Sequence, residues 1–359
     1  MNTKTAGFFN YCLLAIGFGL LFSCTTSAQD IHFSQFYMSP LTLDPATAGA
    51  FKDISASTLY REQWQAVSAA FQTFAIAGDM RLMKAKWKNG YLGVGLNVFS
   101  DKAGDGSLST TQVNLNFAAH VKLDANQILS GGIQAGFGQY SINAGALTWD
   151  NNYDQATGTV TPGLGTAREG YLTNTSILYP DIGAGILYQY NKGEMYVSGN
   201  DVIQTSLGFA VAHINQPDQS FYSINETNRD MLFMKYVAHG NFLFGIKNTP
   251  VSIVPGFIYY RQGPAQEITA GGLLKYTLKE DSKYTGYVKG AAVSAGAYYR
   301  WNDAVIISTL LEISNYAIGF SYDVNVSQLR TASIGRGGFE LALRYVNPSN
   351  FLYQNKARF

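Results

Sequence analysis

The chain reads Gln112-Val113-Asn114-Leu115-Asn116-Phe117-Ala118-Ala119-His120-Val121-Lys122 where its alternation of apolar and polar residues is clearest. Successive side chains of a strand point to opposite faces, which gives this stretch two different surfaces. The apolar face would carry Val113, Leu115, Phe117, Ala119 and Val121. The polar face would carry Gln112, Asn114, Asn116, His120 and Lys122. Half-buried strands of soluble sheets look the same, so the fold class depends on how often the pattern recurs.

The alternation recurs almost everywhere after residue 54. It is clear in the ranges 91–99, 129–137, 316–324 and 339–345. Counting such runs gives about fourteen strands, and bacterial outer-membrane barrels have even strand numbers. Two ranges, 200–215 and 251–261, alternate poorly, which leaves a margin of about two strands. The sequence therefore predicts an all-β fold, a transmembrane antiparallel β-barrel of the outer membrane.

The composition favours the same class of protein. Charged residues make up 14% of the chain, aromatic residues another 14%, and there are 37 glycines. Soluble domains usually carry about a quarter charged residues. After the N-terminal leader no segment is long and apolar enough to cross a membrane as a helix. The near-zero net charge of +1 gives no indication of a nucleic-acid partner.

Residues 1–28 have the features of a secretory signal peptide. The apolar run 13–22 is shorter than the roughly twenty residues that a spanning helix needs. Small residues at 26–28 predict cleavage after Ala28, so that the mature chain begins at Gln29. Lipidation of Cys24 is the alternative. Either way, the signal exports the protein from the cytoplasm.

Turn signals separate the strand-like runs and suggest which end of each strand faces the cell exterior. We expect the short turns on the periplasmic side: Lys88–Gly90, Leu123–Asn126, Tyr190–Gly193 and Arg300–Asp303. We expect the longer connections outside the cell: Ser100–Thr111, Ser141–Tyr179, Gln216–Arg229 and Ser327–Gly338. Aromatic residues near predicted strand ends suggest an interfacial girdle: Tyr188, Tyr190, Tyr259, Tyr260 and Tyr299.

Residues suited to catalysis or metal binding are few. Both cysteines, Cys12 and Cys24, lie in the leader, which leaves the mature chain without disulfides or thiolate ligands. The four histidines lack metal-ligand spacing and are expected to face the lumen or to be hydrogen-bonded: His32, His120, His213 and His239. No motif marks a nucleophile, and Asp101–Gly106 lacks the spacing of a calcium loop. We therefore predict no enzyme, no cofactor and no metal site.

Two groups of residues are candidates for binding or structural roles. The first is an aromatic segment restrained by prolines, which must either plug the lumen or bind a periplasmic partner: His32, Phe33, Ser34, Gln35, Phe36 and Tyr37, with Pro40 and Pro45. The second surrounds the last two strands. Arg330 and Arg336 lie in a predicted loop that is either simply solvated or binds an acidic partner. Glu340 and Arg344 should face the lumen and pair with opposite charges, because isolated buried charges are costly.

Several stretches resemble the PorP/SprF family of type IX secretion and gliding motility: Gln29–Ala46, Tyr60–Trp64, Leu92–Phe99, Ala212–Pro217, Tyr322–Ser327 and Arg336–Leu341. Together they extend over nearly the whole mature chain. The resemblance implies an outer-membrane barrel of Bacteroidetes type. Some members couple to a periplasmic motor-associated ring, and others serve secretion and surface attachment of large adhesins. Asp44 stands where the family more often has asparagine.

These observations predict four segments: a signal peptide (1–28), an N-terminal periplasmic or plug segment (29–53), a barrel (54–347) and a C-terminal tail (348–359). The resemblance implies a function in export or surface anchoring of a secreted adhesin-like protein. Its expected partners are the adhesin or its C-terminal signal domain, periplasmic type IX or motor-associated proteins, and outer-membrane lipid. The alternative is a channel or transporter for hydrophobic or small solutes, which a barrel with an N-terminal plug also suits.

Overall fold

The computed structural model describes most of the chain between residues 30 and 347. The described ranges are 30–63, 71–83, 87, 89–104, 106–143, 153–154, 159–160, 175–192, 200–221, 231–280, 290–327 and 335–347. The predicted signal peptide, the predicted C-terminal tail and Arg330 lie outside them. No helix in these ranges is long and apolar enough to cross a membrane.

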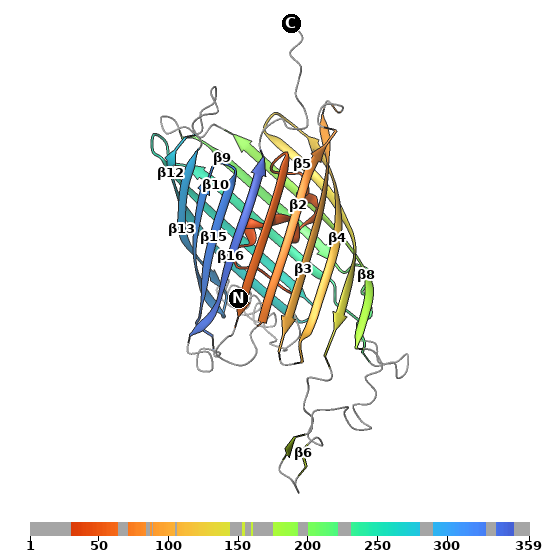
Figure 1. Ribbon diagram of the computed structural model, residues 1–359. Helices are drawn as coiled ribbons and strands as arrows, with labels where there is room; N and C mark the ends of the chain where they lie inside the picture. Colours follow the sequence, from red (N-terminus) through yellow and green to blue (C-terminus); the bar gives the residue numbers. More distant parts are fainter. Residues whose placement is uncertain are drawn as a thin grey trace, which may run out of the picture.

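Fourteen antiparallel strands close into a barrel (Figure 1). Each strand pairs with its neighbours along the chain, and β1 pairs with β16 to close the ring. The strands of the barrel are β1 (Ile54–Gln63), β2 (Phe71–Leu82), β3 (Gly90–Ala103), β4 (Leu108–Lys122), β5 (Gln127–Ser141), β8 (Ser176–Lys192), β9 (Ile203–Ala212), β10 (Lys235–Gly245), β11 (Val251–Gln262), β12 (Ala265–Lys279), β13 (Ala291–Arg300), β14 (Ala304–Ile313), β15 (Tyr316–Asn325) and β16 (Arg336–Asn347). In the connection between β5 and β8, β6 (Tyr153–Asp154) and β7 (Thr159–Val160) form a separate two-stranded sheet.

The predicted alternation is confirmed by the burial of the strands. In β4, Val113, Leu115 and Phe117 are exposed on the outer surface, whereas Asn114 and Asn116 are buried inside the barrel. The poorly alternating ranges 200–215 and 251–261 contain β9 and β11, so the strand count of fourteen is confirmed. Lipid therefore meets an apolar surface, while the interior is lined with polar and small residues.

The two ends of the barrel differ in their connections. One end, here called the loop end, carries the β5–β8, β9–β10 and β15–β16 connections. The other, the turn end, carries the short β4–β5 and β14–β15 turns and the start of β1. Because long loops of outer-membrane barrels are extracellular, the loop end faces the cell exterior. All four predicted long connections join strands at this end.

Two expectations about these connections are wrong. The turn Arg300–Asp303 joins β13 to β14 at the loop end, not at the periplasmic end. Its shortness misled the prediction, because in an up-and-down barrel the side of a turn follows from its order along the chain. The connection predicted at Ser100–Thr111 is also shorter than expected. Its flanks continue the hairpin, with Asp101 paired to Thr110 and Ala103 paired to Leu108.

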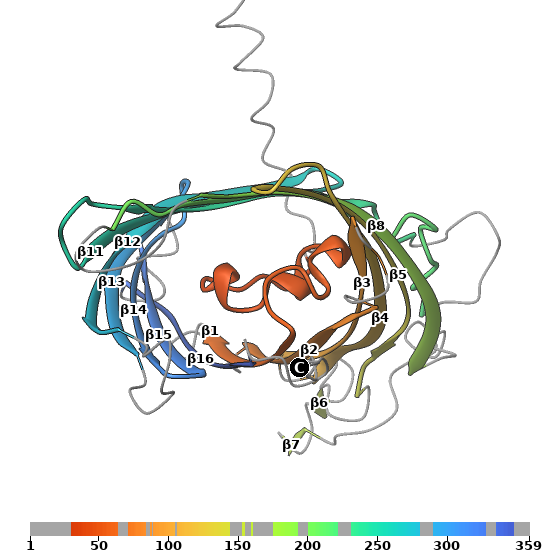
Figure 2. The same cartoon turned by 90° about the horizontal axis from the view of Figure 1, so that it is seen from above.

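The chain before β1 lies inside the ring rather than below it. In the view along the barrel, this orange-red segment occupies the middle of an oval lumen (Figure 2). It forms three short 3-10 helices, η1 (Phe36–Met38), η2 (Pro40–Thr42) and η3 (Pro45–Thr47). Proline begins η2 and η3, where its fixed φ suits a first helical position. Asp44 caps η3 by accepting a hydrogen bond from the Ala46 amide at 2.7 Å.

Candidate functional site

The candidate site is the plug segment, residues 30–53, together with the inward-facing side chains that hold it. Its apolar residues Phe33, Phe36, Met38 and Leu41 are all buried. Burial of an aromatic or aliphatic side chain contributes about 1.5–3 kcal/mol relative to exposure. The segment is thus packed inside the lumen as part of the protein core.

Phe36 and Tyr37 form the aromatic contact between the plug segment and the barrel wall. The Phe36 ring meets Tyr298 of β13 edge to face, with centroids 5.5 Å apart. Tyr37 stacks on the same Tyr298 ring at 5.8 Å. Phe36 also packs in a cluster with Ile258 and Ile306. Such aromatic pairs add about 0.5–1.5 kcal/mol each to the area burial and fix the orientation of the segment.

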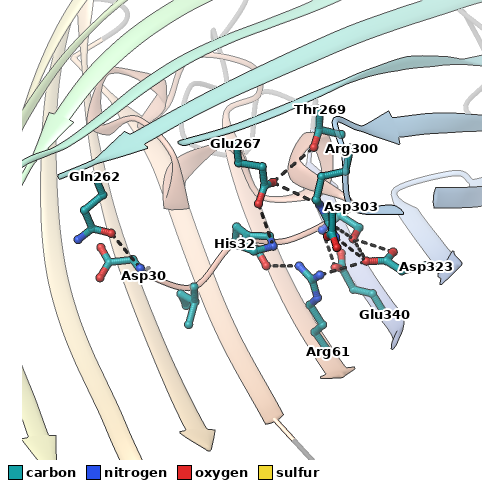
Figure 3. A network of polar contacts seen from close by, with 12 residues as sticks. Asp30, His32, Arg61, Gln262, Glu267, Thr269, Arg300, Asp303, Asp323 and Glu340 are labelled. Carbon is teal, nitrogen blue, oxygen red and sulfur yellow. Dashed lines mark hydrogen bonds and ion pairs between the residues drawn. The ribbon is translucent and has the colours of Figure 1, made fainter. Parts of the chain in front are cut away.

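A central polar cluster, Arg61, Glu267, Arg300 and Asp323, surrounds Ser34 of the plug segment (Figure 3). Asp323 of β15 lies between two guanidinium groups, with Arg61 Nη2 at 3.1 Å and Arg300 Nη1 at 3.0 Å. The Ser34 hydroxyl of the plug segment donates to Asp323 Oδ1 at 2.9 Å and accepts from Arg300 Nη2 at 2.8 Å. Arg300 Nε also lies 3.3 Å from Glu267 Oε1. Removing one member of a buried ion pair costs about 3–5 kcal/mol, so the cluster fixes Ser34 firmly.

Glu340 binds the plug segment through its backbone. Its carboxylate accepts hydrogen bonds from the Ser34 amide at 2.7 Å and from the Gln35 amide at 2.9 Å. The Gln35 side chain donates in return to the Glu340 carbonyl oxygen at 3.1 Å. Arg61, the cross-strand neighbour of Glu340 on β1, is the opposite charge beside this carboxylate, while backbone N–H groups supply its hydrogen bonds. Hydrogen bonds to a carboxylate are about twice as strong as those between neutral groups.

Arg344 also lies near an opposite charge. It faces the lumen, and its Nη2 atom lies 4.0 Å from the carboxylate of Glu312. Its Nη1 atom donates to the Tyr37 carbonyl oxygen at 3.2 Å. Arg336 begins β16 and is exposed. It does not touch the plug segment, so it remains a candidate for an external contact only.

His32 and Tyr260 meet at the edge of the central cluster. His32 Nε2 lies 3.3 Å from Glu267, and the His32 carbonyl oxygen accepts a hydrogen bond from Arg61. The centroids of the Tyr260 and His32 rings lie 6.3 Å apart, and Lys235 Nζ lies over the Tyr260 ring, 5.1 Å from its centroid. Tyr260 is buried in the lumen, so its predicted place in an external aromatic girdle is wrong.

An outer polar cluster, Asp30, Asp181, His213 and Lys235, holds the first described residue at the loop end. His213 bridges two carboxylates, with Nε2 2.6 Å from Asp30 and Nδ1 2.7 Å from Asp181. Lys235 Nζ lies 3.7 Å from Asp30 and donates to the Ile31 carbonyl oxygen at 3.2 Å. Burial lowers the pKa of His213, but the two aspartates outweigh it and raise that pKa from 6.5 to about 9. Burial alone would raise the pKa of Asp30, yet the charges of His213 and Lys235 hold it below its ordinary value.

An inner polar cluster, Asp79, Arg81 and His120, holds the segment near the turn end. Arg81 donates to the carbonyl oxygens of Gly49 at 2.6 Å and Ala50 at 2.7 Å. Asp79 accepts from the Gly49 amide at 2.8 Å. His120 contacts the Ala48 carbonyl oxygen at 2.8 Å. Midway along the segment, Asp44 lies 3.3 Å from His239 of β10, so all four histidines face the lumen and have polar partners.

Glycines of the barrel wall give the plug segment room to lie close to the strands. A Cβ at Gly132 would overlap the backbone of Ala46, and one at Gly93 would overlap the Ala48 carbonyl oxygen. A Cβ at Gly185 would overlap the Asp44 carboxylate. Gly93 and Gly185 thus make room inside the barrel. The occupant of that room is η3 and its flanks.

A small cavity remains between the plug segment and the wall formed by β3–β5 and β8–β10. Its volume is about 60 Å³, and Phe33, Leu43, Asn114 and His213 are among its lining residues. A site of this size and polarity has room for a few ordered waters. Within the described part of the chain, no three His, Cys, Asp or Glu side chains are arranged to hold a metal ion.

The structure brings the predicted segment His32–Tyr37 together with Glu340 and Arg344, and it leaves Arg336 outside. Sequence reasoning missed the residues that hold the segment, above all Arg61, Arg300 and Asp323. One signal was available, because each is a charged residue at an inward-facing position of an alternating strand. Their convergence depends on closure of the barrel, which brings β1 close to β13 and β15 from the other end of the chain.

Solved structures with similar folds are membrane proteins of several kinds. A deletion mutant of the monoaromatic hydrocarbon channel TodX is 10% identical, covers 86% of this chain and 94% of its own, and has a TM-score of 0.46. A FadL homologue from Pseudomonas aeruginosa is 9% identical over 84% of this chain and 92% of its own, with a TM-score of 0.40. BamA from Haemophilus ducreyi is 10% identical, covers 82% of this chain and 70% of its own, and has a TM-score of 0.39. At such identities the likeness concerns the fold alone.

The family comparison is more specific. No curated protein matches the chain. The profile of the type IX secretion system membrane protein PorP/SprF matches residues 25–345, nearly the whole chain. Together with the closed barrel and its apolar outer surface, this match localises the protein to the outer membrane. The chain belongs to the PorP/SprF family of type IX secretion system membrane proteins.

Proposed function

We propose that this protein is a non-enzymatic outer-membrane scaffold that supports export or surface anchoring of a secreted adhesin-like protein. The observation that carries the proposal is the fixed plug segment in a barrel of this family. Polar clusters at the outer, central and inner levels hold the segment, and Phe36 and Tyr37 pack on the wall. A barrel filled in this way is suited to hold a partner at its ends rather than to pass solutes through its lumen.

The partner is proposed to bind at the loop end, where the long connections gather. Its most suitable element is the C-terminal signal domain of the secreted protein. Arg336 begins β16 at that end, and we propose that it and Arg330, which precedes it in the chain, meet an acidic surface of the partner. At the turn end, periplasmic type IX or motor-associated proteins would meet the short turns.

Phe33 and Phe36 are buried and Tyr37 is half-buried, which bears on how these three side chains could act. To grip a periplasmic partner directly, these side chains would have to leave the lumen and expose apolar surface to water. When these side chains stay in the lumen, their apolar surface is not exposed to water. We therefore propose that they support partner binding indirectly, by keeping the barrel closed and its ends in place.

The alternative, a channel for hydrophobic or small solutes, requires a path through this packing. The cavity of about 60 Å³ beside the plug segment is far smaller than such a path. Transport would need the plug segment to release its buried ion pairs, each of which is costly to separate. The scaffold is therefore the better-supported function.

Affinity purification of the tagged protein from its own host in mild detergent tests the proposal. We expect mass spectrometry to identify a large secreted adhesin or periplasmic type IX components in the eluate. The triple variant Phe33→Ala, Phe36→Ala and Tyr37→Ala should still insert as a barrel but lose these partners. A matched control replaces three exposed, lipid-facing aromatics with alanine, Phe117, Phe137 and Phe320, and should keep them. Recovery of the wild-type protein alone, with only bound lipid or fatty acid, would contradict the scaffold and favour transport.

A further inference from the structure

The plug segment has a direction inside the barrel. Its C-terminal end is at the turn end, because Asp53 directly precedes Ile54, the first residue of β1. The contacts of Gly49 and Ala50 agree with this, since Arg81 lies one residue from the end of β2. The segment therefore leaves the lumen at the periplasmic end, where it joins the barrel.

The other end of the segment lies at the loop end. The Asp30 amide donates to Gln262, the last residue of β11, at 2.9 Å. The Asp30 carboxylate contacts His213, which follows β9, and Lys235, which begins β10. All three partners lie where these strands reach the loop end. Residues 30–53 thus run through the lumen from the extracellular end to the periplasmic end.

The outer polar cluster makes this direction a stable feature. His213 joins Asp30 of the segment to Asp181 of β8, and Lys235 holds the next carbonyl group. Three polar side chains, Gln262, His213 and Lys235, thus converge on the first two described residues, and Asp181 holds His213 from the other side. Buried charges are costly unless they are paired, so these matched pairs favour this one position for the start of the segment.

We infer that the chain is threaded so that the part preceding Asp30, including the mature N-terminus, emerges on the cell surface. The barrel would close around its own N-terminal segment during folding and leave the start of the mature chain beside the β9–β10 connection. This inference deepens the proposed function, since the start of the mature chain becomes part of the surface that a secreted partner meets. Its assignment to the outside rests on the orientation of the barrel and does not depend on which partner binds.

Single-cysteine labelling tests the inference cleanly, because Cys12 and Cys24 fall in the leader. Gln29→Cys places a thiol just before the plug segment. Asn302→Cys, in the exposed β13–β14 turn, is the control for the cell surface. Ala125→Cys, in the exposed β4–β5 turn, is the control for the periplasm. A membrane-impermeant maleimide is applied to intact cells, to lysed cells and to the denatured protein.

We expect Gln29→Cys and Asn302→Cys to be labelled on intact cells and Ala125→Cys only after lysis. Labelling of Gln29→Cys only after lysis, with both controls as expected, would overturn the inference. Labelling only after denaturation would overturn it as well, because the start of the chain would then be enclosed. If the two controls exchange behaviour, the assigned orientation is wrong and the inference fails with it. Loss of partner recovery in the purification experiment would leave the labelling result unchanged, so the two proposals fail separately.

Discussion

His213 is the residue on which the outer end of the plug segment depends most. Its protonated ring lies between Asp30 and Asp181 and forms an ion pair with each carboxylate. The pKa of His213 in the folded protein, about 9, is above its ordinary value of 6.5. A raised pKa stabilises the folded form fully below the ordinary value, and the stabilisation is lost as the pH rises through the raised value. Alkaline pH should therefore loosen this end of the segment first.

We expect limited proteolysis of the purified protein in detergent to reveal this loosening. Cleavage near Asp30 should increase as the pH rises from about 7 to about 10, the range over which a histidine of raised pKa loses its proton. His213→Gln cannot carry the charge and should be cleaved at every pH in that range. A protein whose cleavage near Asp30 does not change between these pH values would show that His213 does not hold the segment by charge.

Glu340 supports a second prediction at the residue scale. It accepts two backbone hydrogen bonds from the plug segment, from Ser34 and Gln35. In Glu340→Gln the amide group can accept only one of them, and the second N–H group is left buried without a partner. Such a loss costs about 1–3 kcal/mol, which thermal unfolding in micelles would measure as a lower midpoint. Arg336→Ala, at the exposed start of the same strand, should change the free energy of unfolding by no more than about 0.5 kcal/mol and leave the midpoint nearly unchanged.

At the scale of elements, the strands were predictable and the arrangement of the plug segment was not. Alternation in ranges such as 112–122 identified strands because lipid and lumen impose opposite demands on the two faces. The same logic could not reveal that Arg61, Arg300 and Asp323 meet, since their strands are joined by closure of the barrel. The turn Arg300–Asp303 was assigned to the wrong end of the barrel because it is short. Tyr260 was assigned to the outer face because it lies near a strand end. Both errors arise because local sequence does not record which end or face of a closed barrel a residue occupies.

The close approach of η3 to the glycines of the barrel wall gives a prediction for this element. Gly132→Ala should push the Ala46 backbone away from β5, because no space exists for the added methyl group. Overpacking of this kind costs about 1–3 kcal/mol. Gly131→Ala is a matched control, because the neighbouring glycine faces open space. Protease protection of the plug segment should fall in the first variant only, while both variants should insert as heat-modifiable barrels. Equal protection in the two variants would mean that the plug segment stays in place without the close packing of η3 on Gly132.

At the scale of the whole molecule, fourteen strands enclose an interior that one continuous segment of the same chain fills. The fold class, the strand number and the outer-membrane location followed from alternation, composition and the family resemblance. The filling of the lumen did not, because the aromatic segment His32–Tyr37 was equally suited to plug the barrel or to bind a periplasmic protein. The buried contacts of Ser34, Gln35 and Phe36 decide between these two positions for the segment in this structure.

Ion conductance tests whether the filled lumen is sealed. The plug segment occupies the space that an open barrel of this size would leave for water and ions. The wild-type protein in planar bilayers should therefore show no steady conductance at neutral pH. The double variant Arg61→Ala and Arg300→Ala leaves Asp323 without its two cations and Ser34 without one hydrogen-bond donor. Because an uncompensated buried charge costs about 3–5 kcal/mol, the segment should leave the lumen part of the time and produce intermittent conductance.

Lys102→Ala, a change to an exposed cation of β3, is the control and should remain closed. Steady conductance of the wild-type protein would contradict the seal and favour the transporter. A double variant that inserts as a barrel yet never conducts would instead show that Phe36 and Tyr37 hold the segment without the ion pairs. The apolar packing and the buried charges therefore make separate predictions, and conductance distinguishes which of them keeps the barrel closed.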